Sequence, residues 1–470
     1  MLTAAASAPA AGARPLQTGI TNLNTAAPLA FQRTRGAGAT FVRIQLYWGG
    51  TAPERKPASW QPENPNDPNY SWGQADEAVI NAVAAGLVPV LQVDGTPEWA
   101  QRCEGPTNLG GPALCDPDPM ALREFAVAAA RRFSGRTPGV PRVQYWQALN
   151  EPNLSIFFFP QYDTSGRALS PELYRDLING FYAGIKSVDP ANLVLAAGLG
   201  PIAIPKFTIG PMRFARQMLC MRGSKRPKPT AGNCGGGVHF DIFAIQPYTT
   251  GNPAHEGGIN DVQLGDLNKL QALIRAADRA GRIVGRFKRT PLWITEFSWD
   301  SRPPDPGGLP MKIETQWTAE ALHVAWRAGV TRFFWYTLRD KPQGPPKEAN
   351  ESGLYFRGPT LEQDVAKPVL DVFRFPFVAY QQGNRRQGRL RFWGRTPNSR
   401  NGRVAIQVLK RGRWRRVLVT RADKAGIIRG VARTRYGRGG HGRVRAVYRG
   451  DASVSFPMKP VGDFYHPPFG

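Results

Sequence analysis

The segments WQALNEPN (residues 146–153) and LWITEF (residues 292–297) decide the fold. Each is a short apolar run that ends in a glutamate, Glu151 in the first segment and Glu296 in the second. Short apolar runs of this length are typical of strands buried in a parallel sheet. Side chains at the carboxyl ends of such strands share one face of an α/β domain, where sites are usually built. The two glutamates are therefore candidates for a common site.

Six further runs of the same kind flank these two segments, with helical periodicity or long loops between them. The expected strands are 16–22, 41–47, 87–94, 143–150, 193–197, 240–246, 292–297 and 332–338. The expected helices are 73–85, 119–133, 171–187, 264–282 and 315–328. Alternating strands and helices indicate a parallel sheet, and eight strands are the number that closes a (β/α)₈ barrel. No Gly-rich phosphate loop follows the first strand, which argues against a nucleotide-binding sheet. We therefore predict a TIM barrel.

The pattern changes after Tyr380. Residues 367–373 are expected to form a last amphipathic helix, and short alternating runs broken by Gly and Asn follow. This pattern is typical of a small antiparallel β-sandwich. Its expected strands are 390–393, 404–409, 414–420, 426–431, 444–448 and 453–456. We predict three parts: an N-terminal segment 1–14, a barrel 15–382 and an Arg-rich accessory sandwich 383–470.

The net charge of +26 is concentrated in this last part. Residues 381–470 carry 22 Lys and Arg against 3 Asp and Glu, whereas the first 380 residues carry 39 against 32. Such an excess favours an anionic partner, such as an acidic cell-wall or matrix polymer. The alternative is a basic surface that serves only solubility. No nucleic-acid recognition motif is visible, so we expect no specific nucleic-acid partner.

The four cysteines form two local pairs in Gly/Pro-rich stretches, Cys103 with Cys115 and Cys220 with Cys234. Four cysteines allow three pairings, and neither local pair has the spacing of a zinc site. Two loop disulfides are the use we predict, and four free thiols in a reducing compartment are the alternative. Disulfides would agree with export to an oxidising compartment.

The N-terminal segment 1–14 is rich in Ala, with small residues spaced as in a signal-peptide cleavage site. We interpret it as the remnant of a signal peptide; a disordered extension of a cytosolic protein is the alternative. No apolar run approaches the roughly 18–20 residues that a membrane span requires. We therefore expect a secreted protein without a transmembrane segment.

Several of these segments resemble clan A glycoside hydrolases. The likeness is strongest to family 39, the β-xylosidases and α-iduronidases, and the cellulase-like family 5 is a near neighbour. It covers roughly residues 15–380. The segments that carry it are FVR (41–43) with Trp48, GTPEWA (95–100), NEPN (150–153), Phe240-Asp241 with Pro247-Tyr248, ITE (294–296) and WY (335–336).

The resemblance implies roles for three residues. Glu151 would be the acid/base, Asn150 would hold the sugar 2-hydroxyl, and Glu296 would be the nucleophile. This is the chemistry of the retaining route, in which one carboxylic acid protonates the leaving oxygen and one carboxylate attacks the anomeric carbon. The acid needs burial and a negative neighbour to stay protonated, and the nucleophile must stay ionised.

Three more residues are candidates beside the glutamates. Arg43 ends the second expected strand and is the cation best placed to keep Glu296 ionised. Tyr248, after the sixth strand, could donate its phenolic hydrogen to the same carboxylate. Where the family usually has His before this Pro-Tyr pair, the chain has Gln246, an amide that hydrogen-bonds but does not titrate. Purely structural roles for Arg43 and Tyr248 are the alternative.

Four tryptophans lie at or just after expected strand ends, where aromatic rings could contact the apolar faces of a sugar. Trp335, on the eighth strand, is the predicted floor under the sugar ring. The others, for which packing is the alternative role, are Trp48, Trp99 and Trp299.

These observations predict a secreted retaining O-glycosyl hydrolase acting on an oligo- or polysaccharide. The five histidines show no metal-ligand spacing, so neither a metal nor a cofactor is expected. A different class of function also fits the aromatic residues, namely a catalytically inactive carbohydrate-binding or cell-surface adhesive protein built on the same barrel. Only an enzyme accounts for both carboxylates.

Overall fold

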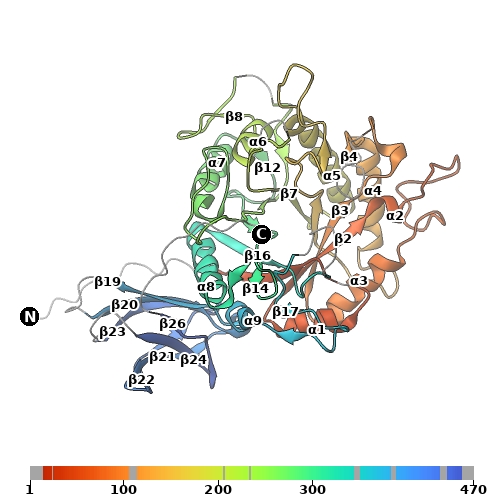
Figure 1. Cartoon of the computed structure of the whole chain (residues 1–470). Helices are drawn as coiled ribbons and strands as arrows, with labels where there is room; N and C mark the ends of the chain where they lie inside the picture. The colour runs from red at the N-terminus through yellow and green to blue at the C-terminus, as the bar shows by residue number, and fades with distance from the viewer. Residues whose placement is uncertain are drawn as a thin grey trace, which may run out of the picture.

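The computed structural model describes residues 14–23, 25–104, 114–204, 207–231, 234–342, 350–382, 388–434 and 442–457. Within these residues, eight parallel strands close into a barrel in the order β1-β2-β3-β5-β7-β11-β13-β16 (Figure 1). The predicted TIM barrel is therefore confirmed. The expected signal-peptide remnant lies almost wholly outside the described residues. The barrel strands are β1 Gln17–Thr21, β2 Phe41–Tyr47, β3 Val88–Asp94, β5 Tyr145–Ala148, β7 Leu193–Leu199, β11 Ile242–Ile245, β13 Leu292–Ile294 and β16 Val330–Tyr336.

Helices surround the barrel on its outer side (Figure 1). All six expected helices are present, with ends shifted by a few residues. Three helices were not expected: α1, α6 and the four-residue α2. The helices are α1 Pro28–Gly36, α2 Trp48–Thr51, α3 Gly73–Ala84, α4 Pro119–Arg132, α5 Ser170–Val188, α6 Pro211–Met218, α7 Leu267–Arg279, α8 Met311–Ala328 and α9 Pro368–Arg374, with 3₁₀ turns η1 Glu98–Ala100, η2 Leu264–Asp266 and η3 Pro397–Ser399.

Short strand pairs decorate the loops of the barrel. They are β4 Leu114–Cys115 with β6 Phe158–Phe159, β8 Met221–Arg222 with β9 Lys228–Pro229, β10 Val238–His239 with β12 Ile283–Val284, β14 Ser301–Arg302 with β15 Leu309–Pro310, and β17 Tyr355–Phe356 with β18 Val365–Ala366.

The interior of the barrel is a compact apolar cluster separate from the main core. It contains Phe41, Val90, Leu193, Leu195, Ile242, Trp293 and Phe334, with Tyr145 packed against it. Side chains of a strand alternate between the barrel interior and the helices outside it. Phe334 therefore points inward and its neighbour Trp335 outward. Gly19 makes room for Phe334, since a Cβ at this glycine would lie 2.4 Å from the phenyl ring.

The C-terminal part consists of two antiparallel sheets, as expected for a β-sandwich. One sheet has the order β19-β20-β23, and the other β22-β21-β24-β25 with β26 beside β24. The first strand, β19, begins at Phe377 and pairs along its length with β20, so we propose Phe377 rather than residue 383 as the start of this module. Its strands are β19 Phe377–Gln382, β20 Arg389–Arg395, β21 Gly402–Lys410, β22 Arg413–Ala422, β23 Ile427–Arg433, β24 Arg443–Tyr448, β25 Asp451–Ala452 and β26 Phe456–Pro457.

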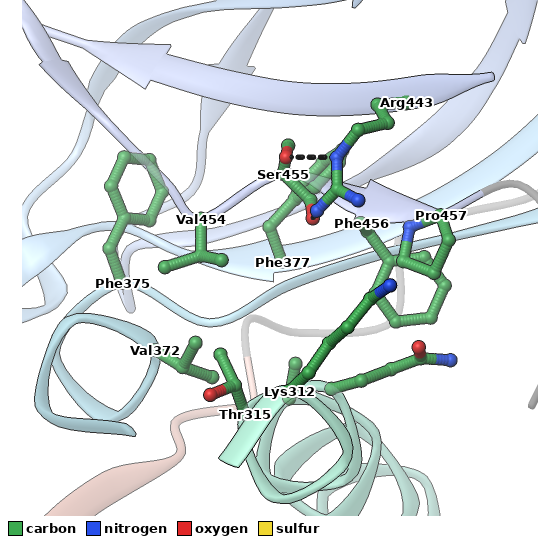
Figure 2. A pocket seen from close by; sticks show the side chains of 12 residues that line it. Lys312, Thr315, Val372, Phe375, Phe377, Arg443, Val454, Ser455, Phe456 and Pro457 are labelled. Carbon is green, nitrogen blue, oxygen red and sulfur yellow. Dashed lines mark hydrogen bonds between the residues drawn. The ribbon is translucent and has the colours of Figure 1, made fainter. Parts of the chain in front are cut away.

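The sandwich packs beside α8 and α9 (Figure 1). Arg395 of β20 is fully buried and donates to the carbonyl of Phe373 at 2.8 Å and to Thr18 Oγ1 at 2.8 Å. Arg374 forms an ion pair with Asp451 at 2.6 Å. A cavity of about 120 Å³ lies at this junction, where Arg443 and Ser455 of the sandwich face the side chains of α8 (Figure 2). The buried Arg395 and the partly exposed Arg374–Asp451 pair join the sandwich to the barrel.

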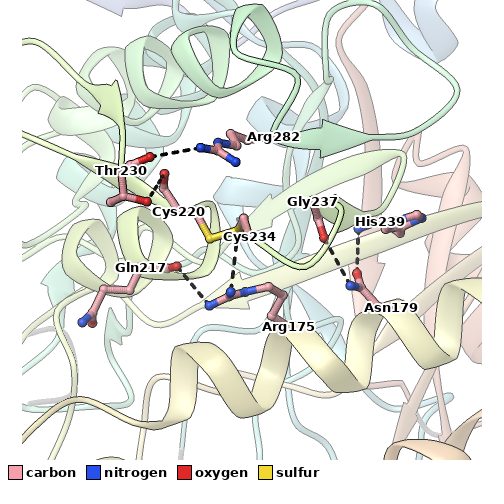
Figure 3. Close-up of a disulfide and its surroundings, with 9 residues drawn as sticks. All are labelled: Arg175, Asn179, Gln217, Cys220, Thr230, Cys234, Gly237, His239 and Arg282. Carbon is pink, nitrogen blue, oxygen red and sulfur yellow. Dashed lines mark hydrogen bonds between the residues drawn. A yellow bond between two sulfur atoms is a disulfide. The ribbon is translucent and has the colours of Figure 1, made fainter. Parts of the chain in front are cut away.

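Two disulfides close loops of the barrel domain, Cys103–Cys115 and Cys220–Cys234. The predicted pairing is confirmed. Figure 3 shows the second disulfide, just beyond the end of α6. Arg175 of α5 donates to Cys234 Sγ at 3.6 Å and to the carbonyl of Gln217 at 3.4 Å, so α6 is tied to its neighbouring helix at this end.

Candidate active site

The carboxyl ends of the barrel strands bring the candidate residues together. Arg43 lies on β2, Asn150 and Glu151 directly follow β5, and Gln246 and Tyr248 follow β11. Glu296 follows β13. Because neighbouring parallel strands end at the same rim, positions that are far apart in sequence converge there.

Arg43 is the hub of this group. Its Nη1 atom donates to Glu296 Oε1 at 2.6 Å and to Thr21 Oγ1 at 3.0 Å, and its Nη2 atom donates to Asn150 Oδ1 at 2.7 Å. The side chain is only 3 % exposed. A buried guanidinium needs a carboxylate partner, and its planar fork fixes the geometry of both residues that it contacts.

Asn150 is held in one orientation. Its Oδ1 atom accepts from Arg43 and also from Gln246 Nε2 at 2.8 Å. Both partners are donors, so the shared atom is the oxygen and the amide NH₂ is left to donate elsewhere. Gln246 therefore positions Asn150. A different residue donates to the nucleophile candidate, Glu296.

That partner is Tyr248. Its hydroxyl donates to Glu296 Oε2 at 3.1 Å, so Glu296 accepts one hydrogen bond on each oxygen. The phenol ring stacks on Phe297 with 6.1 Å between centroids. Burial and the neighbouring Glu296 charge raise the pKa of Tyr248 well above its usual value, so it stays protonated and can donate.

Glu151 has the opposite environment. It is 9 % exposed, and burial together with the negative charge of Glu296 raises its pKa well above the usual value, while Arg43 partly opposes the shift. Its backbone has φ 39°, in the left-handed region. Gly200 makes space for the carboxyl group, because a Cβ there would lie 2.9 Å from Glu151 Oε1. This environment favours the protonated form of the carboxyl group.

Asp94, at the end of β3, belongs to the same group and was not predicted. Burial raises its pKa to about 6; the Gly95 N–H and the Arg43 charge lower it, and the Glu296 charge raises it further. Its position at a strand end was a usable signal, since the other site residues share it. In the described part of the chain, no three acidic, His or Cys side chains are placed to hold a metal ion.

Three of the four predicted aromatic platforms are wrong. Trp335 is fully buried, donates its Nε1 hydrogen to the Ser352 carbonyl at 2.7 Å and points toward the outer helices. Trp48 stacks on Phe125, and Trp299 packs against Phe297 and Trp317. None of the three exposes a face to a ligand.

Other aromatic rings do reach the rim. Tyr336 follows Trp335 on β16, is partly exposed, and its hydroxyl accepts from Asn22 Nδ2 at 2.7 Å. Tyr47 ends β2, is exposed, and covers Gly95. Trp99 is partly exposed but is anchored through Nε1 to the Pro53 carbonyl at 2.9 Å and packs edge-on against Trp60. The alternation of side chains along a strand could have identified Tyr336 as a rim residue, because it lies two residues after Phe334 and shares its inward face.

By sequence, the chain matches no protein-family model and no curated protein. By structure, it is similar to a family 39 glycoside hydrolase from Bacteroides cellulosilyticus WH2, with a TM-score of 0.53, 15% identity, and coverage of 90% of this chain and 81% of that chain. It is also similar to the family 39 enzyme of Xanthomonas axonopodis pv. citri, with a TM-score of 0.52, 14% identity and coverage of 90% and 93%. A family 39 β-xylosidase from Caulobacter crescentus gives a TM-score of 0.51 at 17% identity, with coverage of 85% and 84%. The resemblance that the motifs predicted thus extends to the fold, which is that of the clan A glycoside hydrolases of family 39.

Proposed function

We propose that the protein is a retaining glycoside hydrolase that cleaves O-glycosidic bonds of an oligo- or polysaccharide. The observation that supports this most is the contrast between two carboxyl groups on one rim. Glu296 receives a hydrogen bond from Arg43 and one from Tyr248, whereas burial and a negative neighbour favour the protonated form of Glu151. An ionised nucleophile beside a protonated acid is the arrangement that double displacement requires.

In the first step, a Glu296 oxygen attacks the anomeric carbon while Glu151 gives its proton to the glycosidic oxygen. The bond to the leaving group breaks, and a glycosyl ester forms on Glu296. In the second step, Glu151 takes a proton from water, which attacks the same carbon and releases Glu296. The free amide hydrogens of Asn150 are available for a sugar hydroxyl during both steps.

The experiment is a screen of the purified protein over aryl glycosides and polysaccharides, followed by the Glu296→Gln variant on the best substrate. We expect loss of nearly all turnover, roughly 10⁴-fold or more, because the amide cannot form the covalent intermediate. Glu77→Gln, an exposed change on α3, serves as the matched control. Binding of sugars without hydrolysis by the wild type would instead support the inactive carbohydrate-binding alternative.

We also infer that the sandwich holds an anionic polymer. Arg403 on β21 lies directly opposite Arg421 on β22, and on the same face Arg445 stacks over Trp414 at 4.2 Å. Like charges in opposite strand positions repel each other, and an anion bound between them would relieve this. The double variant Arg403→Gln/Arg421→Gln should lose sedimentation with an acidic polysaccharide, and unchanged sedimentation would leave solubility as the role of the charge.

The disulfides support export to an oxidising compartment. Among the described residues, no helix is both long and apolar enough to cross a membrane. Titration of free thiols in protein taken from its native compartment tests the export proposal. We expect none without reductant, and four reactive thiols would contradict it.

A further inference from the structure

A second pocket lies among the loops that follow β5, β7 and β11. It has a volume of about 520 Å³, within the range of about 300–1,000 Å³ that is usual for ligand sites. Three rim loops and the start of α6 form its walls. The lining residues are Tyr162, Gly166, Ala203, Thr208, Gly210, Arg213 and Asn260.

The pocket is joined directly to the turn that carries Glu151. Leu154, in this turn, forms an antiparallel bridge with Thr208 of the pocket wall. The N–H of Ile209 donates to the Asn153 carbonyl at 2.9 Å, and Asn153 Nδ2 returns a bond to the Ile209 carbonyl at 3.0 Å. These contacts join the pocket wall to the residues that follow Glu151 in the chain.

The proposed reaction indicates which part of a substrate would lie in this pocket. The acid protonates the oxygen that departs with the leaving group, so the leaving group must lie on the acid's side of the sugar bond. A pocket next to the Glu151 turn is thus placed for a leaving-group sugar. This step rests on the proposed function.

The charged group of the pocket is a guanidinium. Among the described residues, no carboxylate lines the pocket and none forms an ion pair with Arg213, whose Cζ lies 5.8 Å from the Tyr162 ring centroid. Asp163, in an adjoining loop, is already paired with Arg167 at 3.0 Å. Arg213 is therefore available to a ligand.

A second guanidinium strengthens the positive potential. Arg216 lies one turn further along α6 and donates to Asn260 Oδ1 at 2.7 Å. Burial and the Arg213 charge both lower its pKa, as expected for two cations held close together. The far end of α6 is fixed by the Cys220–Cys234 disulfide and Arg175 (Figure 3), so the helix presents Arg213 from a rigid support.

We propose that this pocket is the leaving-group subsite and that it selects a sugar unit carrying an anionic substituent, a carboxylate or a sulfate, which Arg213 binds. The apolar part of the lining and Phe207, 63 % exposed beside it, offer surface to the C–H faces of the same sugar. The substrate class is accordingly an acidic oligo- or polysaccharide.

The test measures binding, so that it does not depend on turnover. Oligogalacturonides of two to four units and their methyl esters are titrated by calorimetry into the Glu296→Gln protein, and a sulfated disaccharide and its desulfated form make a second pair. We expect one charged ligand to bind about tenfold more tightly than its neutral match, as one charge-assisted hydrogen bond provides. The pair that shows the difference identifies the anion.

Variants then assign the preference to Arg213. Adding Arg213→Gln should abolish it, Arg213→Lys should keep part of it, and Arg279→Gln, an exposed change on α7, should leave it intact. Should Arg213→Gln melt below the assay temperature, Ala203→Trp fills the pocket from an exposed position and should block binding as well. Equal binding of both charged ligands and their neutral matches, or a preference that survives Arg213→Gln, would overturn the proposal.

The two proposals fail in different ways. A wild type that hydrolyses no glycoside but shows the Arg213-dependent preference refutes the hydrolase and keeps the subsite. An active wild type without that preference refutes the subsite alone.

Discussion

Two groups of buried carboxyls in this molecule differ in what surrounds them. At the rim, Glu151 and Glu296 share Arg43 and lie beside polar donors. In the loops that follow β13 and β16, Lys367 is buried and donates to Asp340 Oδ1 at 2.6 Å and to Ser301 Oγ at 2.7 Å. Burial raises the pKa of Asp300 to about 7 and of Glu314 to about 8 in this second group.

The comparison shows that a raised pKa does not by itself identify a catalytic acid. Glu314 is 1 % exposed and packs in the protein interior near the single cation Lys367. Glu151 is buried too, but it lies near a second carboxyl group, Glu296, which accepts hydrogen bonds from Arg43 and Tyr248. In the proposed reaction, the rim supplies both the proton donor and the nucleophile. The residues around Lys367 stabilise the folded structure by enclosing the charge of this lysine.

The largest contrast is expected between Glu296→Gln and Lys367→Met. Glu296→Gln should remove nearly all turnover. Its loss of stability should be smaller than that of Lys367→Met, because the new amide oxygen can still accept from Arg43 at this partly exposed position. Lys367→Met should lower the free energy of unfolding by about 3–5 kcal/mol, since it leaves Asp340 buried without its cation. Urea unfolding of both variants measures this, with the exposed Lys312→Met as control. Equal losses of stability in Glu296→Gln and Lys367→Met would remove the distinction between the two regions.

The second contrast concerns pH. Glu314 and Asp300 have raised pKa values in the folded state, so the folded protein binds more protons than the unfolded chain. Their contribution to stability is present below about pH 4 and is lost as pH rises toward 7 for Asp300 and 8 for Glu314. The slope is on the order of 1.4 kcal/mol per pH unit for each group. Melting curves from pH 5 to 8 should show this fall, and Glu314→Gln should flatten it.

At the rim, the same physics acts on activity. Glu151 must be protonated in the first step, so turnover should fall as pH rises through its raised pKa. The pH–rate profile of wild type and Glu314→Gln checks this. The fall of turnover at high pH should be the same in the variant. A fall that shifts in Glu314→Gln would mean that Glu314, and not Glu151, is the group whose titration limits turnover.

A smaller effect is expected from Tyr248→Phe. The variant keeps the ring that stacks on Phe297 but loses one hydrogen bond to Glu296. A charge-assisted hydrogen bond is worth about 1.5–3 kcal/mol, so turnover should fall by about 10- to 100-fold. Steady-state kinetics on an aryl glycoside measure the loss, and full activity would mean that Tyr248 is only structural.

Much of the rim could be predicted from sequence because it follows from strand ends. Glu151 and Glu296 each stand where an apolar run stops, and parallel strands bring such positions together. Arg43 lies within β2, as the one charged residue of that strand. The error at Trp335 has a simple cause, since side chains alternate and a shift of one residue exchanges the inner and outer faces. The run FFWY (333–336) is apolar on both faces, so hydropathy gave no register.

Other features had weaker signals. Helix α6, which carries Arg213, is short, and its neighbouring residues are Gly/Pro-rich, so the sequence suggested a loop. The group around Lys367 joins residues from four separate segments through loop geometry, which no local pattern encodes. Strand β19 was missed because it begins only three residues after the end of α9, and its apolar residues were assigned to the barrel.

The central claim is that Glu151 acts as the acid and Glu296 as the nucleophile in one reaction. The most direct test compares Glu151→Gln and Glu296→Gln on aryl glycosides whose leaving phenols range from strongly to weakly acidic. We predict that Glu151→Gln loses about 10²- to 10⁴-fold in turnover on the weakly acidic phenols and little on the most acidic ones, which need no proton. Glu296→Gln should fail on all of them. An equal loss across the series in Glu151→Gln would contradict the account.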